Sequence, residues 1–170
     1  MNEVLKAISD RRSIRGYKDE PLKKEQVDAL VKAALESPSA RNLQPWHFSF
    51  LQGRRDILDM INEAAGVKTD IFYGAPLVVF ISAAKGAYFF TPIDCGIAVE
   101  NLALAAHSMG LGSVILGMPR AAFETDKGEE ICKLLKFPED HEFKIAIAIG
   151  IPNTTKEAHP IGEGKVDFVD

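Results

Sequence analysis

The spacing of apolar residues changes along this chain, and the changes predict both helices and strands. Around 4–8, 27–35 and 57–65, apolar residues recur at three- and four-residue intervals, the pattern of helices with one covered face. From residue 46 the period falls to two, so that Trp46, Phe48 and Phe50 share one side of a predicted strand. The chain therefore contains both kinds of element, and helices precede and follow the first strand.

Three further segments are apolar on more than one side. The runs 77–81 and 143–149 are typical of central strands covered on both faces. The helix expected from about Asp94 to Met109, with Asp94 as its N-cap, has almost no polar face. Because one chain of 170 residues offers little surface to cover such a helix, the pattern predicts burial by a second subunit.

The remaining segments are shorter. Residues 112–117 indicate a short strand that leads into a glycine turn, and Thr125 or Asp126 is expected to cap a helix carrying Ile131. The tail 151–170 is rich in Pro, Gly and Thr, and it ends with three apolar residues at 166, 168 and 169. These three predict an edge strand that packs on another subunit.

Composition describes an ordinary globular chain of one domain, 1–170, with 46% hydrophobic and 26% charged residues. A net charge of −4 argues against a general nucleic-acid or membrane-surface partner. No signal peptide or apolar run of spanning length is visible. The two cysteines, Cys95 and Cys132, form no disulfide framework, which fits a cytoplasmic protein.

Several common sites have no sequence signal. The four histidines show no metal-binding spacing, and we therefore expect no metal centre. Gly110-Leu111-Gly112 follows a helix and enters a strand, the reverse of a dinucleotide cradle. Cys95 lies near a helix start, where a thiol pKa can fall, but no base is placed beside it, so a packed thiol is the favoured interpretation.

Positive charge is concentrated in one short segment of this acidic chain. Arg11, Arg12, Ser13 and Arg15 place three guanidinium groups and a hydroxyl within five residues. A phosphomonoester is bound by such donors. The alternative is that the arginines only neutralise the dipole at the end of the preceding helix, a contribution of ~0.3–1 kcal/mol each. Taken alone, the segment slightly favours that alternative.

The loop Ser37–Trp46 joins a helix to a strand, and prolines at 38 and 45 stop both elements. Asn42 and Gln44 in this loop could hydrogen-bond a planar heterocycle. The alternative is a rigid connector in which Trp46 fills the core. Gly117, after an apolar strand, would let a backbone N–H approach a flat ligand, although an ordinary turn would also use a glycine there.

Together these motifs resemble those of the nitroreductase family of FMN-dependent oxidoreductases, over nearly the whole chain. The segment 11–17 is similar to the family's opening Arg-Arg-Ser-x-Arg-x-Tyr/Phe motif, and 38–46 is similar to its Pro-Ser-x-x-Asn-x-Gln-Pro-Trp loop. Asp94-Cys95-Gly96 and the glycines at 110 and 112 resemble its central dimer helix and the turn that follows.

The resemblance implies an α+β fold, a three-layer α-β-α sandwich that forms an intertwined homodimer with FMN at two sites between the subunits. By position, the phosphate and ribityl end of FMN would be held by Arg11, Arg12, Ser13 and Arg15, with Lys165 as the basic residue of the tail. The opposite subunit would contribute Pro38, Ser39, Ala40, Asn42 and Gln44. Leu116 and Gly117 would lie against the isoalloxazine, with the backbone N–H of Gly117 near N5, and Lys68 is a further candidate at the ring.

The function implied is transfer of hydride from NAD(P)H through flavin N5 to a nitroaromatic, a quinone or a similar small acceptor by a ping-pong scheme. Because the chemistry belongs to the cofactor, no acid–base pair is required in the sequence. Alternatives are a non-catalytic dimeric FMN carrier or flavin-responsive module, and an unliganded structural dimer. Flavin-fragmenting and dehalogenating members of the family leave the acceptor open.

Overall fold

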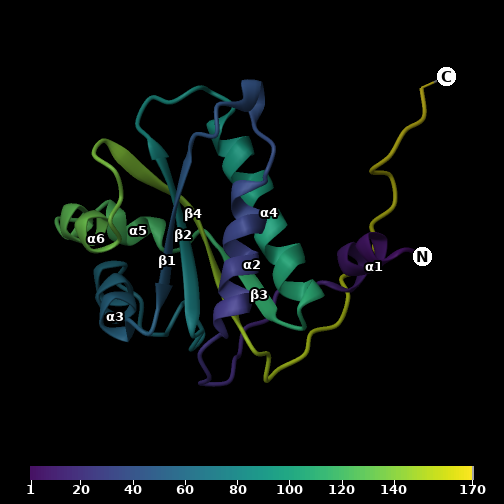
Figure 1. Cartoon of the computed structure of the whole chain (residues 1–170), viewed down its shortest axis with the longest axis horizontal. Helices are drawn as coiled ribbons and strands as arrows, with labels where there is room; N and C mark the ends of the chain where they lie inside the picture. Colours follow the sequence, from purple (N-terminus) through teal and green to yellow (C-terminus); the bar gives the residue numbers. More distant parts are fainter. Residues whose placement is uncertain (170) are drawn as a thin grey trace.

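The computed structural model describes residues 1–169 and shows three layers (Figure 1). The middle layer is an antiparallel sheet with the order β1-β2-β4-β3. Its strands are β1 (Trp46–Gln52), β2 (Leu77–Ala84), β3 (Gly112–Leu116) and β4 (His141–Gly150). One face is covered by α2 (Lys24–Leu35) and α4 (Thr91–Ser108). The other face is covered by α3 (Arg55–Ala64), α5 (Arg120–Phe123) and α6 (Gly128–Leu134). The predicted α-β-α sandwich is therefore confirmed.

Each face of the sheet has its own hydrophobic core. Val78 and Phe80 of β2 pack toward α3, α5 and α6, whereas Leu77, Val79 and Ile81 pack toward α2 and α4. All five side chains are fully buried. The continuous apolar run of β2 thus follows from its place in the middle of a sheet with helices on both sides.

The start of β4 departs from the predicted alternation. The pairing of β2 with β4 shifts register between Ile81 and Ser82, because Ile81 pairs with Ile145 and Ser82 pairs with Phe143. Lys144 is the extra residue of this bulge. As a result Phe143 lies in the core beneath α5 and α6, and Ile145 lies on the opposite face. A strict period of two, which places Phe143 and Ile145 together, is wrong at this point.

Two predicted helix caps are also wrong. The helix α4 begins at Thr91, with Phe90 as its N-cap, so Asp94 lies inside its first turns. The helix α6 begins at Gly128 with Lys127 as its cap, so neither Thr125 nor Asp126 caps it. The four-residue helix α5 was not predicted, since four residues are too few to show a helical period.

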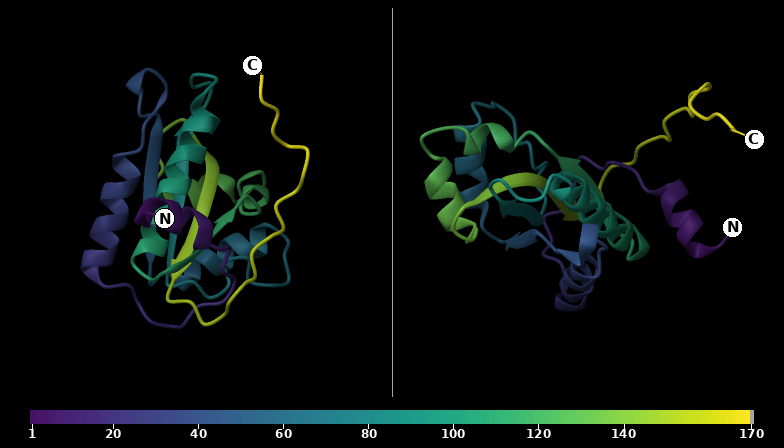
Figure 2. Two further views of the ribbon diagram at one scale, coloured as in Figure 1. Left: turned by 90° about the vertical axis from the view of Figure 1, so that its right-hand side faces the viewer. Right: turned by 90° about the horizontal axis from the view of Figure 1, so that it is seen from above.

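Two segments extend away from the three layers (Figure 2): α1 (Glu3–Asp10) and the chain after β4. No residue of α1 is buried, although its Val4, Leu5 and Ile8 are apolar and more than half exposed. Val166, Phe168 and Val169 of the tail are also exposed, Phe168 to 90%. One chain therefore leaves the apolar residues of both segments without cover. Within the described residues, no helix combines the length and apolar character needed to cross a bilayer.

Candidate functional site

The arginine-rich segment is held against the edge of the sheet. Ser13 forms a parallel bridge with Ser113 of β3, and the Ile14 N–H donates to the Ser113 carbonyl at 2.9 Å. Ile14 and Tyr17 are buried, and the Tyr17 hydroxyl lies 2.7 Å from the Ile14 carbonyl oxygen and 3.2 Å from that of Ala148. Burial raises the pKa of Tyr17, which keeps this hydroxyl protonated. These contacts fix the backbone between the arginines.

The three arginines have different surroundings. Arg12 donates to the carbonyls of Ser9 and Arg11 at 2.6 and 2.8 Å, so its guanidinium caps the end of α1. Arg11 Nε lies 3.3 Å from Glu100 Oε1 of α4, yet this buried nitrogen has no hydrogen-bond partner of good geometry among the described residues. The guanidinium of Arg15 lies 6.0 Å from the ring centre of Tyr73. Arg12 thus matches the helix-capping interpretation, whereas Arg11 and Arg15 retain donors for a ligand.

A cavity of about 310 Å³ opens beside this segment. Arg11, Arg12, Ser113 and Lys156 are among its lining residues. Lys165, the basic residue predicted from the sequence, lies in the exposed tail and does not line it. The tail residues that do line it include Thr154–Lys156, a short polar stretch separated from the last strand by three residues, and no pattern in the sequence singles it out.

A larger cavity of about 730 Å³ lies elsewhere, between Tyr17, Gly53 and Pro76. Its two arginines are already paired with carboxylates: Arg54 with Asp56, and Arg55 with Asp59 and Asp70. The size of a cavity therefore does not identify the site here. The smaller cavity is the candidate, because its Arg11 has a guanidinium nitrogen without a hydrogen-bond partner among the described residues.

The loop Ser37–Trp46 has an unusual backbone. Arg41, Asn42 and Gln44 have φ values of 55°, 54° and 46°, in the left-handed region that costs a non-glycine residue roughly 1 kcal/mol or more. Ser39 Oγ accepts from the Gln44 N–H, and Gln44 Nε2 donates to Asn42 Oδ1, both at 2.9 Å. The polar side chains of the loop thus brace one another in a fixed shape, while Trp46 is buried at the start of β1.

The loop and the arginine segment contact different parts of the surface of α4. Ala40 contacts Asp94 in the first turns of the helix and Ser37 contacts Asn101 past its middle, whereas the cavity beside Arg11 and Arg12 is lined by His107 and by no residue of the loop. Within one chain these two motifs do not form a single site. A site that uses both requires the loop of a second chain, as the resemblance implies.

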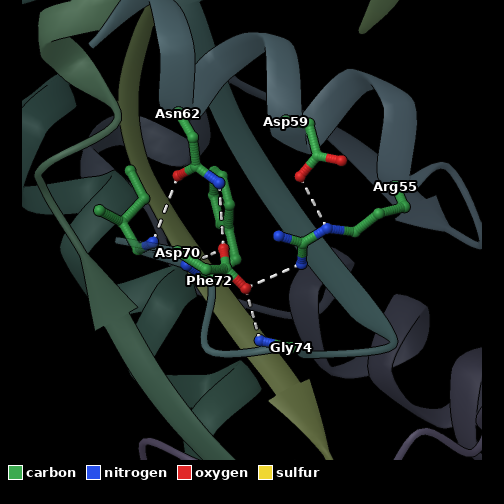
Figure 3. Close-up of polar contacts among 7 residues, drawn as sticks. Arg55, Asp59, Asn62, Asp70, Phe72 and Gly74 are labelled. Atoms are coloured by element: carbon green, nitrogen blue, oxygen red, sulfur yellow. Dashed lines mark hydrogen bonds and ion pairs between the residues drawn. The ribbon is translucent and has the colours of Figure 1, made fainter. Parts of the chain in front are cut away.

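The connection between α3 and β2 is fixed by Asp70 (Figure 3). Its carboxylate accepts from Arg55 and from the backbone N–H groups of Gly74 and Phe72 at 2.7–3.0 Å, and from Asn62 at 3.1 Å. Although burial opposes the change, these hydrogen bonds lower the pKa of the Asp70 carboxyl. The network holds the loop that carries Tyr73, the aromatic neighbour of Arg15. Lys68, in the same loop, is exposed.

The remaining predicted positions behave as follows. Leu116 is the last residue of β3 and is buried, whereas Gly117 is exposed, and a Cβ placed on Gly117 would meet no atom within 4 Å. The protein itself therefore does not require a glycine there. Cys95 is buried, and desolvation raises the pKa of its thiol to about 11, which agrees with a packed thiol.

Comparison with known proteins assigns this fold and these motifs to a family. The model of the nitroreductase family matches residues 8–68 and 63–151, and the chain belongs to this family. A protein of Archaeoglobus fulgidus with the provisional name NADH dehydrogenase/NAD(P)H nitroreductase is 34% identical over 92% of this chain and 90% of its own. An FMN reductase [NAD(P)H] of Bacillus subtilis is 30% identical over 82% of this chain and 61% of its own.

Solved structures agree with the assignment. A nitroreductase from Desulfitobacterium hafniense, crystallised with bound FMN, superimposes over 100% of both chains with a TM-score of 0.92 and 30% identity. A nitroreductase from Bacteroides fragilis gives a TM-score of 0.90 over 100% of both chains at 23% identity, which shows the shared fold.

Proposed function

We propose that this protein is an FMN-dependent oxidoreductase that passes hydride from NAD(P)H through flavin N5 to a nitroaromatic, a quinone or a similar acceptor by a ping-pong scheme. The observation that carries the proposal is the cavity beside β3 that is lined by Arg11, Arg12 and Lys156, in a chain of net charge −4. Family membership and the FMN held by the Desulfitobacterium hafniense relative support it.

The residues present fit a phosphate. Arg11 Nε is buried without a hydrogen-bond partner among the described residues, and Lys156 lines the same cavity. Arginine, lysine and hydroxyl donors are the groups that bind a phosphate dianion. We assign Arg11, which lines the cavity, and Ser13 and Arg15, which lie beside its lining residues in the chain, to the phosphate and ribityl end. Lys156 takes the role that was expected for Lys165. Arg12 contributes through its charge, since its guanidinium already caps α1.

When bound, FMN supplies the hydride chemistry, and the protein supplies binding, orientation and exclusion of water. Pro38, Ser39, Ala40, Asn42 and Gln44 of a second subunit complete the site at the ring. Leu116 ends the strand that presents the Gly117 N–H to the ring. Because Gly117 bears no side chain and faces open space, its backbone is accessible to a flat ligand.

The proposed assembly is a homodimer built on α4. Ile93 and Ile97, four residues apart on this helix, are 55% and 37% exposed in one chain. The uncovered apolar residues of α1 and of the tail 151–170 provide further surface for a partner. A second copy that covers these three segments would also bring its own loop toward the arginine segment.

The experiment that tests the function starts with the purified protein. Denaturation should release a compound that comigrates with FMN rather than FAD, and anaerobic NAD(P)H should bleach the flavin absorbance. Addition of a quinone or nitroaromatic should restore it, and double-reciprocal plots should be parallel. A colourless protein that gains no flavin absorbance when mixed with FMN would contradict the proposal, and bound FMN that NAD(P)H cannot reduce would indicate a carrier.

A further inference from the structure

The helix α4 contacts the loop Ser37–Trp46 at two points. The Ala40 N–H donates to Asp94 Oδ1 at 2.9 Å, and Asn101 Nδ2 donates to Ser37 Oγ at 3.0 Å. Asp94 and Asn101 are seven residues apart, which places them on the same face of the helix about 10.5 Å apart along its axis. The two hydrogen bonds therefore hold the start of the loop, Ser37 to Ala40, along one face of the helix.

Asp94 is an unusual residue for its position. It is only 3% exposed and sits beside the packed Cys95, yet it is not the helix cap that its place in the sequence suggests. Its second oxygen, Oδ2, is buried and has no hydrogen-bond partner among residues 1–169. A buried carboxylate with so few partners is costly. The hydrogen bond from the Ala40 N–H is therefore the contact that accounts for a carboxylate at this buried position.

The loop in turn needs external support. Its three left-handed residues begin at Arg41, directly after the residue that Asp94 holds, and such conformations persist only where the surroundings impose them. A third contact supports the same end of the loop, since the Arg41 guanidinium lies 5.0 Å from the ring centre of Tyr88, just before α4. The loop therefore depends on α4 for its shape.

We propose that Asp94, together with Asn101, is a positioning residue for FMN binding. Asp94 touches Ala40 and sets the course of the loop through Asn42 and Gln44, the residues that contact the ring. This inference rests on the proposed function. It assigns Asp94 and Asn101 to the cofactor site indirectly, through the loop, and it predicts that the acceptor oxygen of Asp94 matters more than its charge.

The test compares FMN affinity among variants of the full-length protein, each checked for folding by far-ultraviolet circular dichroism. Asp94→Ala removes the acceptor and should weaken FMN binding about tenfold or more, and Asn101→Ala should weaken it about threefold or more. Asp94→Asn keeps an acceptor for the Ala40 N–H, and it should bind FMN within about threefold of wild type. The visible circular dichroism of bound flavin should change in Asp94→Ala and recover in Asp94→Asn.

Leu102→Ala is the matched control, because Leu102 is fully buried on the same helix, in the hydrophobic core, and its apolar side chain makes no hydrogen bond to the loop. It should destabilise the fold but leave FMN affinity and the flavin spectrum of the folded protein unchanged. Wild-type affinity in Asp94→Ala, or an equal loss in Leu102→Ala, would overturn the inference while the proposed function stood. If Asp94→Ala does not fold, the FMN affinity of Asn101→Ala becomes the test, and wild-type FMN affinity in that variant would refute the positioning role. Failure of the wild-type protein to bind FMN would instead refute the proposed function.

Discussion

Removal of the Arg11 guanidinium should weaken FMN binding without weakening riboflavin binding. Arg11 belongs to the only part of the described chain where a buried guanidinium nitrogen lacks a hydrogen-bond partner, and it lines the cavity beside β3. FMN and riboflavin differ only in the phosphate. A comparison of the two ligands in Arg11→Ala therefore isolates the phosphate contact from every effect on the flavin ring.

The magnitude follows from the kind of contact. A hydrogen bond to a charged group contributes about 1.5–3 kcal/mol, which corresponds to roughly a 10- to 150-fold increase in Kd. The contact of Arg11 with Glu100 adds little to this value, since that pair is 3.3 Å apart and the Glu100 side chain is 44% exposed. Arg15→Ala should have an effect of similar size. Arg12→Ala should cost less, because its guanidinium is already bonded to two carbonyls.

Isothermal titration of the apoprotein with each ligand measures the effect. The difference in FMN affinity between wild type and Arg11→Ala should become smaller as the salt concentration is raised, because salt screens the attraction between the Arg11 guanidinium and the phosphate in the wild-type protein. Lys24→Ala is the charge control: it removes one positive charge from an exposed ion pair with Asp28 on α2 and should leave both affinities unchanged. If riboflavin affinity fell as far as FMN affinity in Arg11→Ala, the arginine would be structural and the phosphate assignment wrong.

Three further predictions concern the assembly, the ring site and the fold. Sedimentation of the flavin-loaded protein should show a dimer, and a stable flavin-loaded monomer would contradict the partner inferred for α1 and α4. Gly117→Val should fold, because an added Cβ meets no protein atom, but stopped-flow reduction of its flavin by NAD(P)H should be slower than in wild type. Asp70→Asn should lower the free energy of unfolding at pH 7 by about 1.5–3 kcal/mol. Because the folded pKa of Asp70 is depressed, its contribution is present above the unfolded value near 3.8 and is lost as the pH falls through the folded value, so urea titrations of the two proteins should converge in acid.

The central strands could be predicted from the sequence because they are apolar on both faces, whereas the three-layer arrangement was implied by the resemblance to the nitroreductase family. The run 77–81 is apolar at every position, and the structure covers both faces of β2 with helices. The bulge at Lys144 could not be predicted in this way. It depends on pairing with β2, and the alternation on either side of it looks the same in the sequence whether or not one residue is skipped.

The cofactor motifs were visible in the sequence as residue types, but the roles of individual residues depended on contacts that the sequence does not show. Arg11, Arg12 and Arg15 cannot be told apart by residue type, yet in the structure the Arg12 guanidinium donates to two carbonyls at the end of α1, whereas Arg11 Nε has no hydrogen-bond partner among the described residues. The proposal of Lys156 instead of Lys165 for the phosphate site has the same origin, because Lys156 lines the cavity and Lys165 does not. Which lysine of the tail lies near the arginines depends on the turn that follows β4, and no periodic pattern describes that turn.

Asp94 shows how a local rule can hide a long-range contact. Aspartate is a preferred N-cap residue, and Asp94 precedes an apolar helical run, so the N-cap rule alone is enough to explain an aspartate at this position. The sequence held a contrary signal in Pro92, since proline favours the first turn of a helix and so places the start of α4 before Asp94. Once Asp94 lies inside the helix, its carboxylate needs another reason to be buried. That reason is Ala40, 54 positions earlier in the chain, and the contact links the helix expected at the subunit boundary to the loop expected at the flavin. Occupation of the flavin site and association of the two chains should therefore stabilise each other, because both depend on the same helix holding the same loop.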